Sequence, residues 1–302
     1  SKYRYVLTFI DYSGQEFLTG DLNTGFSFKA DYTTSPTPDG GRGYAFSFTA
    51  LTQSPAKEYS ILSPAEISGC KLWLDSTEAV YNDTNKIMRW PDKSGTGNHF
   101  IQTDNSLRPL RESDLSVRFN SSNSGMYCTS TGLTNLTGLT VVTVAKIIDN
   151  GAGLSAVFLS KGGPFDEEEV EFLYSFTPDL GGHLRLVCNN ALNGFADRIN
   201  DEDYSSIHAQ GYRVLVLRWE ANELPVFQNN DEESLTDTGY YSGWDDVSNT
   251  GTYDTLLRMG AVTGLANNLD FKVKENMAWN RSLTDAELAK VMEMLNDKYE
   301  LY

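Results

Sequence analysis

The sequence predicts an all-β protein, an antiparallel β-sandwich with a C-terminal helix, preceded by a small β domain. Between residues 69 and 280, short runs of β-branched, leucine and aromatic residues are separated by clusters of Gly, Asn and Asp. No amphipathic helical pattern interrupts these runs, which favours a sandwich or jelly roll over a parallel α/β sheet. Apolar residues recur at helical spacing only after residue 284.

Residues 1–62 are expected to form the small β domain, which we interpret as an adaptor. Alternating apolar residues at Tyr5–Phe9, Phe26–Phe28 and Tyr44–Phe48 predict strands, and the Pro- and Gly-rich stretch Ser35–Gly41 separates the last two. The aromatic content is high for so small a unit. It therefore indicates a surface that is buried against the rest of the chain or against another protein.

Residues 63–302 are expected to form the sandwich. Ser63–Glu66 has the Ser and Glu of a capping box with Pro at the first helical position, which predicts one helical turn. Strands are predicted at Val141–Ile148, Tyr212–Trp219, Leu256–Val262 and Leu269–Trp279. A second capping box, Thr284–Glu287, predicts the start of the terminal helix. Its apolar stripe consists of Leu288, Val291, Met292, Leu295 and Tyr299 and should pack against the sandwich.

Charge and hydropathy argue against several classes of partner. The chain has 24 Lys and Arg and 41 Asp and Glu, a formal net charge of -17. Nowhere do Lys and Arg cluster within five to eight consecutive residues, so nucleic acid is a poor partner. The longest aliphatic or aromatic runs have four residues, so no membrane-spanning helix is expected. The first residues show no signal-peptide pattern, and synthesis in a host cytoplasm is expected unless a leader was removed.

The cysteines are expected to be buried free thiols. Cys70, Cys128 and Cys188 are odd in number and widely spaced, and they form no CxxC pair; one disulfide with a leftover thiol is the alternative. Trp73, Trp90 and Trp219 lie inside strand-like patterns and are assigned to the core. In the turn between Trp90 and Phe100, Asp92 and Asn98 are expected to cap their own backbone.

Five segments, in order, resemble the concanavalin A-like lectin/glucanase (laminin-G-like) superfamily. These segments are Ser63–Asp75, Met88–Phe100, Ser116–Asn120, Leu257–Ala261 and Trp279–Leu288, and the second matches a W-x-D-x-S-G-x-G-N turn. The resemblance covers residues 63–302 and implies an antiparallel jelly-roll sandwich with a closing helix. It leaves the function open, because this sandwich serves lectins, glycosidases and structural modules alike.

One acidic segment is a candidate catalytic strand. On an extended strand Glu167, Glu169 and Glu171 would share one face, and they resemble the E-x-D-x-E-F strand of laminarinase-type retaining glycosidases, with Glu at the Asp position. A retaining mechanism needs two carboxyl groups roughly 5 Å apart, so these side chains would have to converge across a concave sheet. We favour the alternative, a solvated acidic loop, because Gly and Pro directly precede the segment.

A Gly-rich segment near residue 240 is the candidate ligand-binding loop. Sugars are usually held by aromatic faces together with amide and carboxylate groups. Tyr240, Tyr241, Trp244, Asp245 and Tyr253 supply this combination in one stretch. Contact with a glycan or receptor is one hypothesis for this loop. Self-packing or a subunit contact is the other, because a large loop in a sandwich often buries one aromatic residue as its own anchor.

Calcium is a weaker hypothesis. Asp201, Asp203 and Asp231 lie in segments dense in the oxygen ligands that calcium prefers, but no D-x-D-x-D-G spacing is present. An excess of acidic residues produces such clusters by chance, so we expect no metal and no cofactor here.

The sequence favours a non-enzymatic, virion-associated structural protein whose lectin-like domain faces outward and binds host-surface glycans. A short β domain before such a sandwich is the layout of many phage tail, fibre or head-decoration proteins. Residues 1–62 would then contact other virion proteins, and a homo-oligomer is expected because virion proteins are usually symmetric. A glycoside hydrolase or lyase acting on surface polysaccharide, and a purely structural spacer without a ligand, remain as alternatives.

Overall fold

The chain divides into two compact units, Ser1–Ile61 and Leu62–Tyr302. The computed structural model describes residues 7–10, 16–19, 26–34, 42–50, 63–120, 124–129, 132–134, 136–148, 156–162, 170–177, 183–190, 194–199, 211–220, 225–229, 232–235, 256–260 and 269–301. Within these residues, no helix combines the length and the apolar composition needed to cross a membrane.

The first unit contains two antiparallel hairpins. In one, β1 (Leu7–Ile10) pairs with β2 (Glu16–Thr19). In the other, β3 (Phe26–Thr34) pairs with β4 (Arg42–Ala50), in a register that places Phe28 opposite Phe48. The alternating apolar patterns thus overlap β1, β3 and β4. The short strand β2 shows no such alternation, and the sequence does not predict it.

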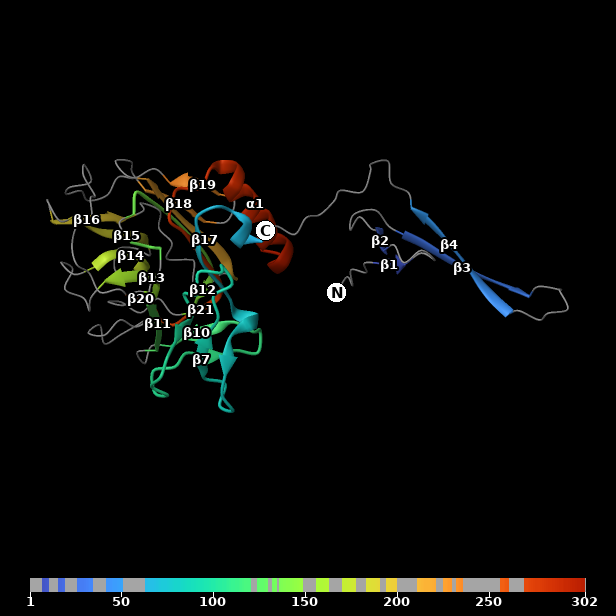
Figure 1. Cartoon of the computed structure of the whole chain (residues 1–302), viewed down its shortest axis with the longest axis horizontal. Helices are drawn as coiled ribbons and strands as arrows, with labels where there is room; N and C mark the ends of the chain where they lie inside the picture. Colours follow the sequence, from blue (N-terminus) through green and yellow to red (C-terminus); the bar gives the residue numbers. More distant parts are fainter. Residues whose placement is uncertain are drawn as a thin grey trace. The chain divides into compact units, whose positions relative to one another are not determined.

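The second unit is a sandwich of two antiparallel sheets (Figure 1). The first sheet has the strand order β19-β18-β17-β12-β21-β10-β9, and β5 pairs with β21 beyond the short β10. Its strands are β5 (Cys70–Asp75), β9 (Leu110–Arg111), β10 (Val117–Phe119), β12 (Gly138–Ile147), β17 (Arg213–Glu220), β18 (Val226–Asn229), β19 (Glu232–Leu235) and β21 (Phe271–Trp279).

The second sheet has the strand order β16-β15-β14-β13-β20-β11-β8-β7-β6. Its strands are β6 (Val80–Tyr81), β7 (Ile87–Trp90), β8 (Phe100–Ile101), β11 (Gly125–Thr129), β13 (Ala156–Gly162), β14 (Val170–Thr177), β15 (His183–Asn190), β16 (Gly194–Ile199) and β20 (Leu256–Gly260). The prediction of an all-β antiparallel sandwich is confirmed. The four strands predicted between residues 141 and 279 correspond to β12, β17, β20 and β21.

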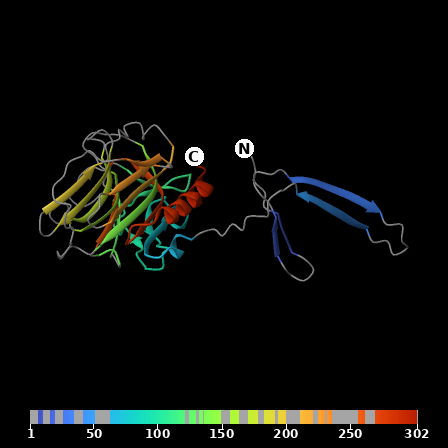
Figure 2. The ribbon, with the colours of Figure 1, turned by 90° about the horizontal axis from the view of Figure 1, so that it is seen from above.

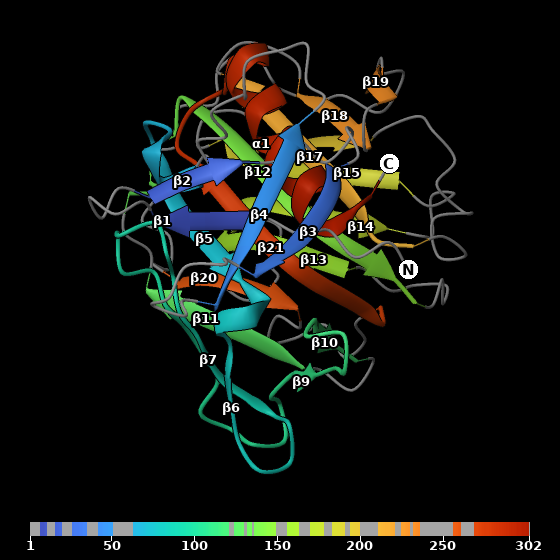
Figure 3. The ribbon, with the colours of Figure 1, turned by 90° about the vertical axis from the view of Figure 1, so that its right-hand side faces the viewer.

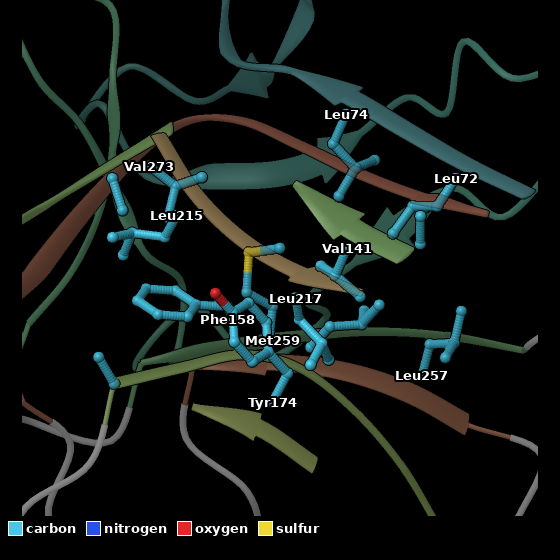
Figure 4. Packing of buried hydrophobic residues seen from close by; sticks show 14 of the residues in the cluster. Leu72, Leu74, Val141, Phe158, Tyr174, Leu215, Leu217, Leu257, Met259 and Val273 are labelled. Carbon is cyan, nitrogen blue, oxygen red and sulfur yellow. The ribbon is translucent and has the colours of Figure 1, made fainter. Parts of the chain in front are cut away.

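The main hydrophobic core fills the space between the two sheets (Figure 4). The first sheet contributes Leu72, Leu74, Val141, Leu215, Leu217 and Val273, and the second contributes Phe158, Tyr174, Leu257 and Met259. Each of these side chains is at most 1% exposed. Packing of this kind explains why alternate positions of the strands are apolar.

A second core lies on the other face of the first sheet, beneath the terminal helix α1 (Asp285–Tyr299; Figure 2). Val142, Val144, Val214, Val216 and Met277 from the sheet pack with Leu288, Val291, Met292 and Leu295 from the helix. Strand β12 is therefore covered on both faces, which explains why residues 138–145 are all buried. The predicted helical stripe is confirmed, with Tyr299 at its partly buried end.

Both predicted capping boxes begin a helix. Pro64–Glu66 forms a single 3-10 turn, in which the Glu66 carboxylate accepts a hydrogen bond from the Ser63 amide at 3.3 Å. At α1, Thr284 Oγ1 accepts from the Glu287 amide at 3.3 Å, and Glu287 Oε2 accepts from the Thr284 amide at 3.0 Å. The helix therefore begins where the sequence predicts, because the backbone amides of Thr284 and Glu287, which have no partner within the helix, each donate to the other residue's side chain.

A bulge in β13 joins the two sheets by a buried polar contact. The register of β13 against β14 shifts between Val157 and Leu159, which leaves Phe158 out of the regular pairing. The carbonyl of Phe158 accepts a hydrogen bond of 2.6 Å from Asn276 Nδ2, on β21 of the opposite sheet. Asn276 is fully buried, so this bond fixes the two sheets relative to each other.

The predicted environments of the cysteines and tryptophans are largely confirmed. Cys70 and Cys128 are buried free thiols, and burial raises the pKa of each to about 12. The side chain of Cys188 lies outside the described residues. Trp90 and Trp219 are in the core, at 0% and 3% exposed.

The prediction for Trp73 is only partly right. Its ring is partly buried against the second core, on the face of β5 that α1 covers incompletely. The Trp73 side chain also contacts two charged residues. The Lys93 ammonium lies 4.3 Å from the ring centroid, and Nε1 donates to Glu275 at 3.2 Å.

Candidate binding surface

One charged cluster lies inside the second unit, and we call it the α1 clamp: Asp75, Glu275 and Lys298. Lys298 Nζ, near the end of α1, donates to Asp75 at 2.9 Å and also to Glu275. The hydroxyl of Tyr299 donates to Glu275 at 2.9 Å. The Asp75 and Glu275 side chains are 5% and 1% exposed. Because these charges already have partners within the fold, we interpret the clamp as a contact that positions α1 and not as a ligand-binding site.

Burial and hydrogen bonding shift the two clamp carboxyls in opposite directions. Burial raises the pKa of Glu275, although the charge of Lys298 opposes this change. Burial also acts to raise the pKa of Asp75, but hydrogen bonds from Thr77, Lys298 and Lys93 outweigh it and hold the value at about 2. Asp75 therefore supplies the firm negative charge that faces Lys298.

The turn between Trp90 and Phe100 is organised around the Asp92 carboxylate. Asp92 accepts hydrogen bonds from the amides of Ser94 and Asn98 within the turn, both at 2.9 Å. It also accepts from the Trp73 amide at 2.9 Å, which ties the turn to β5. Asn98 donates to the Lys71 carbonyl at 2.7 Å. The predicted capping role is confirmed for Asp92, whereas the Asn98 side chain ties the turn to the neighbouring strand and to the Thr96 hydroxyl.

A second group of charged side chains lies at the surface, at the end of the unit where the β6–β7 hairpin projects (Figure 3). We call this region the basic lobe and define it as residues 80–89 and 100–111. Its charged residues are the cations Lys86, Arg89, Arg108 and Arg111 and the acids Asp83 and Asp104, a net charge of +2 in a chain of net charge -17. The formal charge of this region thus has the opposite sign from that of the chain as a whole.

Two of these cations converge on one loop. Lys86 Nζ donates to the Asn105 carbonyl at 2.8 Å, and Arg108 Nη1 donates to Asn105 Oδ1 at 3.2 Å. Arg108 also donates to the carbonyls of Gln102 and Thr103, at 2.8 and 3.1 Å. All of these acceptors are neutral, so they position the two cations without cancelling their charge.

Arg111 is held against an exposed aromatic ring. Its guanidinium lies 4.2 Å from the centroid of Tyr81, and its amide donates to the Asn85 carbonyl at 2.7 Å. Tyr81 is 41% exposed. Arg111 Nε is buried and has no hydrogen-bond partner among the described residues. Stacking on an aromatic ring orients the planar guanidinium while most of its donors stay available.

A row of three apolar side chains and one cation crosses strands β6, β7, β8 and β11. The register places Val80 opposite Arg89, Arg89 opposite Ile101, and Ile101 opposite Tyr127, so the four side chains share one face of the sheet. Val80 and Ile101 are 43% and 37% exposed. With Tyr81 they are three of the four exposed large apolar residues in the described part of the chain. The lobe therefore contains exposed apolar, aromatic and cationic groups.

The sequence-predicted site residues lie almost entirely outside the described residues. Among the candidate catalytic acids, Glu171 lies on β14, which begins at Val170, while the side chains of Glu167, Glu169 and Glu171 are not among those described. The candidate ligand loop and the calcium candidates, Tyr240, Tyr241, Trp244, Asp245, Tyr253, Asp201, Asp203 and Asp231, also lie outside the described residues. These assignments stay predictions. Where side chains are described, no group of three His, Cys, Asp or Glu residues is arranged to hold a metal ion.

The basic lobe could not be recognised from clusters of Lys and Arg within five to eight consecutive residues. Its cations are spread over 26 positions, from Lys86 to Arg111, and cross-strand pairing brings them to one end of the sandwich. The net charge summed over a longer window would have revealed the lobe, because residues 86–111 are net positive in an acidic chain.

Comparison with known proteins identifies similar folds only. No protein-family model matches the sequence, and no curated protein matches it either. Among solved structures, the chain resembles the binding domain of Paraclostridial Mosquitocidal Protein 1, with a TM-score of 0.51 and 14% identity. That match covers 78% of this chain and 53% of the other.

Two botulinum neurotoxin structures are also similar. The binding domain of botulinum neurotoxin DC in complex with rat synaptotagmin II matches with a TM-score of 0.52 and 12% identity, over 77% of this chain and 52% of the other. A structure of botulinum neurotoxin type C, whose cell entry is described as dependent upon interaction with two ganglioside molecules, matches with a TM-score of 0.52 and 10% identity, over 77% of this chain and 53% of the other. This chain spans about half the length of these structures, and identities this low show a shared fold alone.

Proposed function

We propose that this chain is a non-enzymatic, lectin-like binding protein that recognises glycans or receptors on a host surface. The observation that carries the proposal is the shared fold with toxin domains, two of which are named as binding domains. The interaction of the type C neurotoxin with gangliosides supports a glycan as the ligand. The exposed aromatic, apolar and cationic side chains of the basic lobe supply a surface of the chemistry that such binding requires.

We further propose that the sandwich is of the concanavalin A-like type and that the protein belongs to a virus particle. The five family-like segments between residues 63 and 288 support the first point, and the short β unit before the sandwich supports the second. In this arrangement residues 1–62 contact other virion proteins and the sandwich faces outward. Light scattering on the purified full chain tests the accompanying homo-oligomer, which a strictly monomeric chain at all concentrations contradicts.

A glycan array tests the binding function directly. The full chain is applied to a broad array with and without chelator, and reducing-sugar release is measured in parallel. The proposal expects saturable binding to a subset of glycans and no release of sugar. Release of sugar would instead indicate a glycosidase, and silence across the array with a folded sample would leave a structural spacer as the better description.

The array also tests the predicted ligand loop. Trp244→Ala removes the largest aromatic side chain of that loop, and a loss of all glycan binding by this variant would place the ligand there. Chelator-sensitive binding would support calcium at Asp201, Asp203 or Asp231.

A further inference from the structure

Three cations of the basic lobe, like Lys274 on β21, contact neutral groups rather than a carboxylate. Across the described part of the chain, Lys93, Arg118, Arg218, Lys272, Arg281 and Lys298 each form an ion pair with a carboxylate. Within the same described residues, Lys86, Arg108 and Arg111 contact carbonyls, an amide oxygen and an aromatic ring instead. In a chain with a net charge of -17, cations that form no ion pair with a carboxylate are available to an anionic ligand.

The effect of these cations on a nearby carboxylate is visible within the lobe. The pKa of Asp104 is lowered, first by the hydrogen bonds from the Ser106 hydroxyl and amide and then by the charges of Arg108 and Lys86. The Asp104 carboxylate itself bonds to Ser106, at 2.7 and 2.8 Å, and forms no ion pair with either cation. The two cations thus stabilise a negative charge near them while their own donors face neutral groups.

Arg111 and Tyr81 add a geometry suited to a charged sugar. A guanidinium presents its donors in a planar fork that matches a carboxylate, and its position over the Tyr81 ring orders that fork in advance. An exposed aromatic face also packs against the apolar side of a sugar ring. The side-chain amides of Asn82 and Asn105, which bond to each other at 3.2 Å, are groups of the kind that contact sugar hydroxyls.

We infer that the basic lobe binds a saccharide that bears carboxylate groups, with Arg111, Arg108 and Lys86 contacting the carboxylates and Tyr81 contacting a sugar ring. This inference rests on the proposed function and names its ligand class and site. A protein partner fits less well, because a stable protein interface buries about 800 Å² per partner. The exposed apolar residues of the lobe are only Val80, Tyr81 and Ile101, and they are interrupted by charge.

Matched pairs of glycans that differ in charge test the inference on the full chain. Polygalacturonate and its fully methyl-esterified form share the same rings, and sialyllactose and lactose differ by one acidic sugar. The first pair represents uronic acids and the second represents sialic acid as the source of the carboxylate. Binding at least about tenfold tighter to the charged member of at least one pair is expected. Increasing salt should weaken that preference.

Substitutions locate the site. Arg111→Gln, Lys86→Gln and Tyr81→Ala should each weaken binding of the charged glycan by about tenfold or more, and Arg111→Lys should not restore it because the planar fork is lost. Lys290→Gln makes the same charge change as Lys86→Gln at an exposed position of α1 and should leave binding unchanged. Tryptophan fluorescence melts confirm that each variant is folded.

The outcomes separate the two proposals. Binding of neutral and charged members alike, or binding that the lobe variants leave intact, overturns the inference but keeps the lectin-like function. Loss of charge preference in Trp244→Ala with retention in the lobe variants also overturns it, in favour of the predicted loop. No binding to any glycan by folded protein overturns both.

Discussion

Removal of the Lys298 ammonium is expected to destabilise the second unit strongly. Lys298→Met keeps the aliphatic stem and a residue that favours helix, but it leaves Glu275 buried without a cation and Asp75 with Lys93 alone. Breaking a buried ion pair on one side costs about 3–5 kcal/mol. Because the Lys298 side chain is 33% exposed, solvent screening reduces this value, and we expect a loss of about 2–4 kcal/mol.

Urea unfolding followed by tryptophan fluorescence measures this loss. All five tryptophans, at positions 73, 90, 219, 244 and 279, lie in the second unit, so the first unit adds no tryptophan signal. Lys290→Met is the matched control, because Lys290 is exposed on the same helix, and it should change the free energy of unfolding by less than about 0.5 kcal/mol. Equal effects of the two substitutions would refute the claim that the clamp stabilises the packing of α1 on the sheet.

The deficit of Lys298→Met should also depend on pH. The pKa of Glu275 is raised in the folded state, first by burial, so the protonated form is favoured by folding. Such a group contributes stability below its unfolded pKa, and that contribution is lost as pH rises through the folded pKa. Without Lys298 the raised pKa should rise further. The loss in free energy of unfolding caused by Lys298→Met should therefore be smaller at pH 5 than at pH 8. A loss that grows on acidification would contradict the role of Lys298 in stabilising the ionised Glu275.

Three further substitutions test the fold, each measured by the same unfolding assay. Asp75 has a pKa of about 2 against an ordinary 3.8, so its contribution of about 2 kcal/mol is present above pH 4 and lost as pH falls toward 2. Asp75→Asn should therefore be destabilising at pH 7 and nearly neutral near pH 2. Gly260→Ala should destabilise by more than about 3 kcal/mol, because φ is +80° there and the added Cβ would lie 2.4 Å from a Phe119 ring carbon; a native-like stability would contradict this packing. Thr284→Ala should cost about 1 kcal/mol through loss of the α1 cap, and no measurable loss would show that the ion pair between Glu287 and Arg281 suffices to hold the start of the helix.

Sequence patterns predict the regular elements because those elements obey local rules. The strands with one face on the core show alternation, and the terminal helix shows both its cap and its apolar stripe. Asp92 is predictable as a turn residue because its main partners lie within the next six residues. Strands of two residues, such as β6 and β8, are too short to show any period and are not predicted.

The charged clusters could not be predicted because they depend on tertiary pairing. Asp75 and Lys298 are 223 positions apart and meet only because β5, β21 and α1 pack together. The cations of the basic lobe are closer in sequence, but their proximity depends on the β6–β7–β8 register and on the Asn105 loop. Aromatic residues near position 240 stand out in the sequence, whereas Tyr81 gains its significance only from the Arg111 beside it.

Hydrogen–deuterium exchange of the full chain tests the central claim, that the basic lobe is the binding surface, most directly. Exchange is compared without ligand and with the charged member of whichever pair binds, polygalacturonate or sialyllactose. The structure predicts slower exchange in peptides covering residues 80–89 and 100–111, with α1 unchanged as an internal control. Protection confined to residues 239–253, or absent from the lobe at saturating ligand, would contradict the claim.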